Sequence, residues 1–188
     1  MALKWYFNLI FLFPILIYCQ DNDFKRKGIS VETSALVLLP YDFDIPSEHD
    51  EISETGKNSQ IRAVNIHLNY YISKCFAFNV ASGYESVNQP KIDYIPITGG
   101  IKWVLNDTIE SLVTSFDLGG QVGHVEKFGV LMRIGVGYRF IIFKKILGVF
   151  ELCYSHQNSY KTFIHQDNRK FDYHNIESAG FKIGIEIY

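Results

Sequence analysis

Apolar residues recur at every second position through most of the chain after Gly28. The pattern is clearest in segment 128–140, where Phe, Val, Met, Ile and Tyr alternate with Gly, Leu and Arg. A period of two is that of a β-strand with two unlike faces, whereas a helix would repeat its apolar positions every three or four residues. Because no segment shows convincing helical spacing, we expect an all-β protein.

Eight segments with this period follow one another along the chain. They are 29–39, 61–71, 75–85, 94–105, 112–123, 128–140, 146–155 and 179–188. Each has roughly ten residues, which is the length that a tilted strand needs to cross a bilayer. Bacterial outer-membrane barrels made from a single chain have an even number of strands, and eight meets that requirement.

The links between these segments alternate in length. The short links are 72–74, 106–111 and 141–145. By contrast, the polar segments 40–59 and 156–175 are long. Short turns on one side and long loops on the other form the layout of an outer-membrane barrel. We therefore predict an eight-stranded antiparallel up-and-down transmembrane β-barrel that occupies residues 29–188.

The apolar face of the predicted strands is expected to contact lipid. Aromatic residues on this face gather toward the strand ends, as the interfacial girdles of such barrels require. They are Tyr70, Phe76, Tyr84, Trp103, Tyr138 and Phe140. A soluble exported barrel, which turns its apolar face inward to a ligand, is an alternative with the same alternation.

The polar face carries charges of both signs in equal number. The acidic members are Glu32, Asp117, Glu151 and Glu186, and the basic members are Lys102, Arg133, Arg139 and Lys182. An eight-stranded barrel is filled by its own side chains, so these charges should neutralise one another as a structural network. Folding neighbouring strands about their links sets Arg133 opposite Asp117 and nearly opposite Glu151. We predict a lumenal Asp117–Arg133–Glu151 row.

The first nineteen residues have the features of a cleaved signal peptide. Lys4 precedes the apolar stretch 5–18, which is too short and too weakly flanked to be a spanning helix. Cleavage after Cys19 would leave 20–28 as a short periplasmic segment, and lipidation of Cys19 is the alternative. Cys75 and Cys153 fall near opposite ends of the barrel, beyond disulfide reach, so we expect two free thiols.

Composition and charge exclude one class of function. The 188 residues contain 18 Lys and Arg against 20 Asp and Glu, a formal net charge of −2. The chain therefore has no excess of Lys and Arg with which to bind nucleic acid. The 15 Phe, 12 Tyr and 14 Gly with only 5 Pro fit a β-protein rich in aromatic residues.

Candidate chemistry is sparse. His49, His156, His165 and His174 fall in or beside the long loops without the spacing of metal ligands, and no nucleophile–base–carboxylate set can be recognised. The acidic segment 42–54 lacks the ligand spacing and the glycine of a calcium loop. We expect no enzyme activity, no cofactor and no metal.

Several motifs resemble the OmpA/OmpX-like outer membrane protein β-barrel domain family of Gram-negative bacteria. They are NIHLNYY at 65–71, YIPITGGIKWVL at 94–105, DLGGQVG at 117–123 and GVGYRF at 135–140. The resemblance implies residence in the cell outer membrane and insertion by the barrel-assembly machinery. Members commonly end in an aromatic residue in phase with the lipid-facing set, whereas Tyr188 is out of phase with Ile183, Ile185 and Ile187.

These observations lead to a functional hypothesis. We expect a monomeric outer-membrane barrel with a structural or surface-interaction role, exercised through loops 40–59 and 156–175 toward an unknown extracellular partner. A small porin-like channel is the first alternative, although eight strands leave an interior only wide enough for side chains. The soluble ligand-binding barrel is the second.

Overall fold

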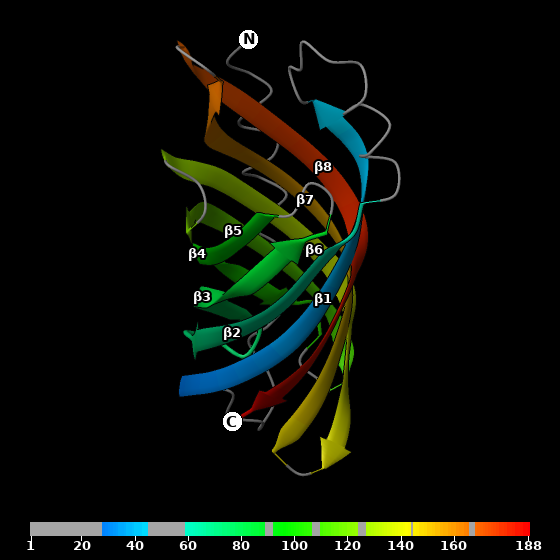
Figure 1. The fold of residues 1–188 in the computed structure, drawn as a ribbon. Coiled ribbons are helices and arrows are strands. Elements are labelled where there is room, and N and C mark those ends of the chain that lie inside the picture. Colours follow the sequence, from blue (N-terminus) through cyan, green and yellow to red (C-terminus); the bar gives the residue numbers. More distant parts are fainter. Residues whose placement is uncertain are drawn as a thin grey trace, which may run out of the picture.

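The computed structural model is a closed barrel of eight antiparallel strands (Figure 1). The structure describes residues 28–44, 59–88, 92–106, 110–123, 127–143, 145–165 and 168–188. The strands are β1 (Gly28–Asp44), β2 (Ile61–Tyr71), β3 (Phe76–Val87), β4 (Ile92–Val104), β5 (Ser111–Gly123), β6 (Lys127–Phe143), β7 (Ile146–His165) and β8 (Asn168–Ile187). Each strand pairs with its neighbours in sequence, and β8 pairs with β1 to close the barrel. The predicted fold class is confirmed, while the predicted signal peptide lies outside the described residues.

The largest difference from the predicted strands is in β7 and β8. Segment 156–175, predicted as a long loop, continues both strands as a hairpin whose register runs from Ser155↔Ser178 to His165↔Asn168. The prediction of a loop there is therefore wrong. Tyr, Thr, Phe and Ile are frequent in segment 160–164, and these residues favour strands even where no apolar face is required. Of the other predicted loop, residues 40–44 belong to β1 and 45–58 lie outside the described residues.

Side chains alternate between the barrel interior and its outer surface along every strand. The outward positions are apolar and exposed, as at Ile66, Leu152 and Ile183, which are 57%, 64% and 53% exposed. The inward positions hold the buried charges, such as Lys102 and Glu186. A soluble barrel has the opposite distribution. The surface is therefore suited to lipid, and the soluble ligand-binding alternative is wrong.

The apolar band on β8 sets the position of the bilayer. Its outward side chains are apolar from Ala179 to Ile187 and become polar at Glu177. Nine residues at about 3.3 Å each, tilted by about 40°, span roughly 23 Å, close to the ~25 Å apolar band of known outer-membrane barrels. In the part of the chain that the structure describes, no helix is long and apolar enough to cross a membrane.

The two cysteines of the barrel behave differently from each other. Cys153 is a free, buried thiol, as predicted, so no disulfide joins it to Cys75. Cys75 is disulfide-bonded and is therefore not a free thiol. The prediction of a free thiol is therefore confirmed for Cys153 and wrong for Cys75.

The β3–β4 ladder is interrupted in one place. Pairing runs from Phe76↔Trp103 to Ser82↔Ile97 and resumes at Glu85↔Tyr94. Gly83 and Pro96 face each other in the interruption, and Pro96 has no N–H group to contribute to the ladder. Gly83 also lies close to β2: a Cβ at this position would be 2.2 Å from the Val64 carbonyl oxygen and 2.2 Å from Asn65 Oδ1.

Gly83→Ala is expected to destabilise the barrel by about 1–3 kcal/mol, because the added methyl group would push against the backbone of β2. Urea unfolding in phosphatidylcholine vesicles, followed by tryptophan fluorescence, measures this free energy. Gly99→Ala is the matched control, since the nearest atom to its Cβ would be 3.8 Å away. Equal losses of stability in the two variants would contradict the close approach at Gly83.

Candidate functional site

The barrel interior has a polar centre between two apolar clusters. One cluster lies toward the outer end and consists of Leu36, Leu38, Ile61, Ala63, Val87, Tyr94, Cys153 and Ile176. The other lies beside the short turns and consists of Tyr71, Ala77, Val104, Val113 and Val149, with Tyr188 packed against it. The polar side chains between them are held away from water at both ends of the lumen.

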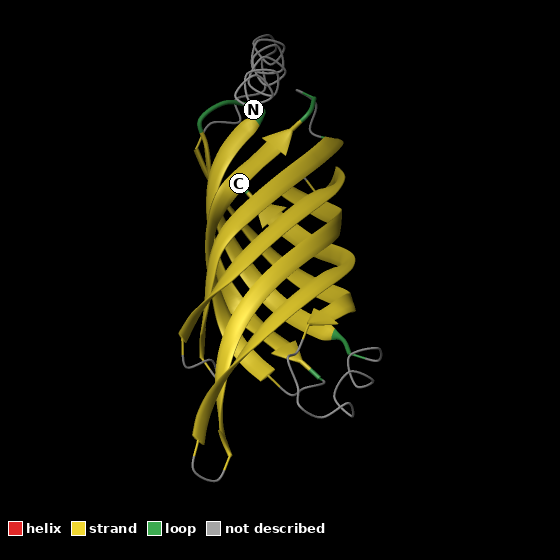
Figure 2. Cartoon of the chain, turned by 90° about the horizontal axis from the view of Figure 1, so that it is seen from above, coloured by secondary structure: helices red, strands yellow, loops and turns green. Residues whose placement is uncertain are grey.

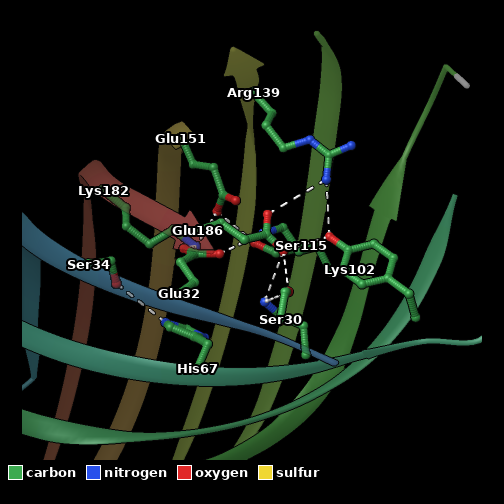
Figure 3. A network of polar contacts seen from close by, with 12 residues as sticks. Ser30, Glu32, Ser34, His67, Lys102, Ser115, Arg139, Glu151, Lys182 and Glu186 are labelled. Atoms are coloured by element: carbon green, nitrogen blue, oxygen red, sulfur yellow. Dashed lines mark hydrogen bonds and ion pairs between the residues drawn. The ribbon is translucent and has the colours of Figure 1, made fainter. Parts of the chain in front are cut away.

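Lys102 of β4 contacts two buried carboxylates inside the barrel (Figure 3). Its Nζ lies 2.5 Å from Glu32 Oε2 and 3.0 Å from Glu186 Oε2. Glu186 accepts two further hydrogen bonds through Oε1, from the Ser30 hydroxyl at 2.6 Å and the Tyr71 hydroxyl at 2.9 Å. All five side chains are at most 2% exposed. The carboxylates that surround Lys102 thus have their lone pairs largely satisfied.

Glu32 joins Lys102 to a second lysine. Lys182 Nζ lies 3.2 Å from Glu32 Oε1 and 2.8 Å from Glu151 Oε2. Glu151 Oε2 also accepts a hydrogen bond from the Ser115 hydroxyl at 2.8 Å. The result is a chain of alternating charge, Glu186–Lys102–Glu32–Lys182–Glu151, which crosses the lumen among four strands (Figure 3).

A separate group of polar side chains occupies the outer half. Arg133 Nη2 of β6 donates to both carboxylate oxygens of Glu85 on β3, at 3.0 and 3.1 Å. The Tyr94 hydroxyl lies 2.8 Å from Glu85 Oε2 and 2.6 Å from Gln157 Oε1. Gln121 Nε2 donates to the same Gln157 oxygen at 2.8 Å. This group spans the lumen from β3 to β7.

All eight charged residues predicted to face the lumen lie inside the barrel. They are Glu32, Lys102, Asp117, Arg133, Arg139, Glu151, Lys182 and Glu186, each at most 7% exposed. Arg139 Nη1 lies 3.6 Å from Glu186 Oε2 and donates to the Tyr188 hydroxyl at 2.7 Å. The ring of Tyr188 packs on Tyr71 at a centroid distance of 5.5 Å. The Tyr188 side chain is therefore directed into the lumen, in keeping with its position out of phase with Ile183, Ile185 and Ile187.

The predicted Asp117–Arg133–Glu151 row forms only in part. Asp117 and Arg133 are cross-strand neighbours, as predicted. The predicted contact of Arg133 with Glu151 is wrong, because the β6–β7 register places Gly137 opposite Glu151. Glu151 pairs with Lys182 instead, and Arg133 with Glu85. In the described part of the chain Asp117 forms no salt bridge, and it hydrogen-bonds to Asn79.

The sequence reasoning missed Glu85 and the buried tyrosines. Glu85 follows Ala77, Asn79 and Ala81 at two-residue spacing, so its phase alone would have placed it on the inner face. Tyr71 and Tyr94 are aromatic and resemble girdle residues in the sequence, yet their hydroxyl groups bind carboxylates inside the barrel. In the sequence, these tyrosines differ from girdle residues only in falling on the alternate positions that face inward.

The polar side chains described in the interior are engaged with one another. Among the described residues, no three His, Cys, Asp or Glu side chains lie close enough together to hold a metal ion. His67, the buried histidine of β2, has its Nε2 3.4 Å from the Ser34 hydroxyl. The charges are arranged in mutual contact rather than around an open space, which is the arrangement of a structural network.

Two solved structures share the fold. The outer membrane protein AlkL, determined by solid-state NMR in DMPC bilayers, superposes with a TM-score of 0.54 and 11% identity, over 90% of this chain and 94% of AlkL. OprG of Pseudomonas aeruginosa superposes with a TM-score of 0.56 and 6% identity, over 86% of this chain and 97% of OprG. No family model and no curated protein sequence matches the chain.

A closed antiparallel barrel with an apolar outer band and a charged, filled interior belongs in a bilayer, because the reverse arrangement would suit water. The protein is an integral outer-membrane β-barrel. Its similarity to AlkL and OprG lies in the fold.

Arg133→Gln is expected to destabilise the barrel by about 3–5 kcal/mol, because Glu85 would remain buried without its cation. The double variant Arg133→Gln with Glu85→Gln should recover most of this loss. Urea unfolding in phosphatidylcholine vesicles measures the free energy for each variant. The matched control is Arg133→Gln with Asp117→Asn, and recovery there equal to that with Glu85→Gln would show that Arg133 does not prefer Glu85.

Proposed function

We propose that the protein acts at the cell surface as a monomeric, non-catalytic barrel that presents its β7–β8 hairpin to an extracellular partner. In this proposal an N-terminal signal peptide directs export and the barrel-assembly machinery inserts the chain. The observation that carries the proposal is the length of β7 and β8, which continue as a paired hairpin about ten residues beyond the apolar band.

The hairpin is long relative to the rest of the barrel wall (Figure 2). From Glu177 to Asn168, ten residues at about 3.3 Å each extend roughly 33 Å along the strand. β1 accompanies β8 only to Asp44↔Asn175, and β2 leaves β1 at Leu38↔Ile61. A two-stranded segment beyond the membrane surface is an ordered platform, and ordering a binding surface in advance reduces the entropy lost on association.

The base of the hairpin is tied to β1 on the outward face. The Tyr41 hydroxyl donates to Glu177 Oε2 at 3.1 Å, and His156 Nδ1 lies 3.5 Å from Glu177 Oε1. The β1–β8 register shifts between Pro40 and Asp42, where a bulge gives β1 an extra residue beside this contact. These interactions join three strands where the hairpin leaves the apolar band, so the hairpin should keep a defined direction.

The filled lumen supports surface interaction over conduction. The charge chain centred on Glu32 crosses the interior, and apolar clusters containing Leu38 and Val104 lie at its two ends. Moving an ion through this interior would require breaking contacts between buried charges, each of which is costly to leave unpaired. The outward hairpin is then the part of the molecule available to a partner.

Shortening the hairpin should remove the interaction without unfolding the barrel. Residues 159–174 would be replaced by an Asn-Gly turn between Asn158 and Asn175, which are cross-strand partners. Adhesion, serum resistance and phage sensitivity are measured in cells that carry the variant. At least one is expected to change by about tenfold, the effect of losing roughly 1.4 kcal/mol of binding.

A second variant separates length from sequence in this test. It keeps the hairpin but replaces segment 159–174 with alternating Thr and Lys, and it should show the same loss. Heat-modifiability on gels verifies that both variants fold. If the shortened protein is folded and all three properties equal those of the wild type, the hairpin is not the interacting surface.

The refolded wild-type protein is expected to give no steady single-channel steps in planar bilayers, because the interior is occupied by paired charges. Addition of the detergent alone is the baseline. Reproducible steps of uniform size would support a channel and contradict a surface role that leaves the lumen closed.

A further inference from the structure

A groove runs across the lipid-facing wall at the interruption of the β3–β4 ladder. It has a volume of about 530 Å³, and Ile66, Leu68, Val80 and Ile97 contribute its apolar walls. Ser82 lies in its floor, in the cross-strand row between Ile66 and Ile97. A small side chain between two large ones makes the hollow, and the missing ladder pairs lie directly beside it.

The groove lies in the outer half of the apolar band. Ser82 lies five residues before Val87, where β3 ends on the outer side, and Tyr84, one outward position further along, is 55% exposed. Arg62 lies four residues beyond Ile66 on β2, about 13 Å along the strand. These positions place Tyr84 near the boundary of the hydrocarbon region and Arg62 at the level of the lipid headgroups.

The charges around Arg62 leave it available to an anion. Its side chain is exposed, and its Nε donates to the neutral Gln60 side chain at 2.9 Å. Asp93 belongs to the same cross-strand row through Ser86, and it is hydrogen-bonded to the Tyr84 hydroxyl. An arginine at this depth is suited to a phosphate oxygen, which it can bind with two N–H groups.

We propose that this groove binds one acyl chain of a phosphorylated outer-leaflet lipid, whose phosphate contacts Arg62. Water has few polar partners in an apolar hollow, and a hydrocarbon chain fills it without leaving a polar group unsatisfied. The surrounding medium supplies acyl chains at this depth, and the arginine selects among headgroups. The site does not depend on the β7–β8 hairpin and stands apart from the proposed surface interaction.

A second groove on the opposite wall provides an internal comparison. It has a volume of about 610 Å³ and is lined by side chains that include Leu152, Ala179 and Phe181. The residues next outward on β7 and β8 are His156 and Glu177, which contact each other. Glu177 contacts this histidine directly, whereas Arg62 at the first groove donates to a neutral amide, so two hollows of similar size should differ in their preference for anionic lipid.

Native mass spectrometry of the refolded full barrel, with bis-phosphorylated lipid A added in detergent, tests the site. Ser82→Trp fills the groove from outside and is expected to weaken lipid binding about tenfold. Ala179→Trp fills the second groove and should leave binding within about twofold. Val80→Trp provides a second filling variant if Ser82→Trp fails to show heat-modifiability.

The headgroup contact is tested separately. Arg62→Gln should weaken binding of bis-phosphorylated lipid A about threefold, the size of one exposed ionic contact, and leave dephosphorylated lipid A unchanged. Inorganic phosphate at the same concentration should not displace the lipid, because it lacks the acyl chain. The proposal is overturned if folded Ser82→Trp or Val80→Trp binds like wild type, or if Ala179→Trp loses as much binding as they do.

Discussion

The pairing of charges inside the closed barrel is the interaction on which the rest of the structure depends. Once the outward positions in the bilayer are given to apolar side chains, every charged group on the membrane-spanning part of the strands must lie in a narrow interior. Glu32 contacts Lys102 and Lys182 there, so a single carboxylate joins two cations that come from different strands. An unpaired charge in such a place would be costly, which makes barrel closure and charge pairing mutually dependent.

The fold could be predicted because the bilayer imposes a simple pattern on the sequence. Lipid on one side and packed polar groups on the other give each strand a period of two, and that period identified all eight strands. Some contacts between adjacent strands could also be predicted from the sequence, such as that between Asp117 and Arg133. Contacts across the lumen could not be predicted in this way. The Arg133–Glu85 pair, for example, joins β6 to β3 and depends on the stagger of the barrel and on the reach of the side chains.

In the outer hairpin the alternation of apolar and polar residues no longer predicts the strands. Beyond Glu177 both faces of β7 and β8 leave the apolar band, so nothing requires apolar residues at alternate positions. The strands nevertheless continue in register to His165↔Asn168. Antiparallel pairing needs only backbone hydrogen bonds and residues that tolerate extended conformations, and a sequence reading based on alternation mistakes such a polar hairpin for a loop.

The interrupted ladder at Gly83 and Pro96 shows how such a wall can tolerate a local defect. A broken pair of strands in lipid would normally leave backbone groups without partners, at several kcal/mol each. Proline at the interruption reduces that cost, because it has no N–H group to be left unpaired. Glycine on the facing strand lets β3 approach β2 closely, where a Cβ would collide with Val64 and Asn65. Placing both residues at one position confines the defect to a shallow hollow and leaves the remaining pairs of β3 and β4 intact.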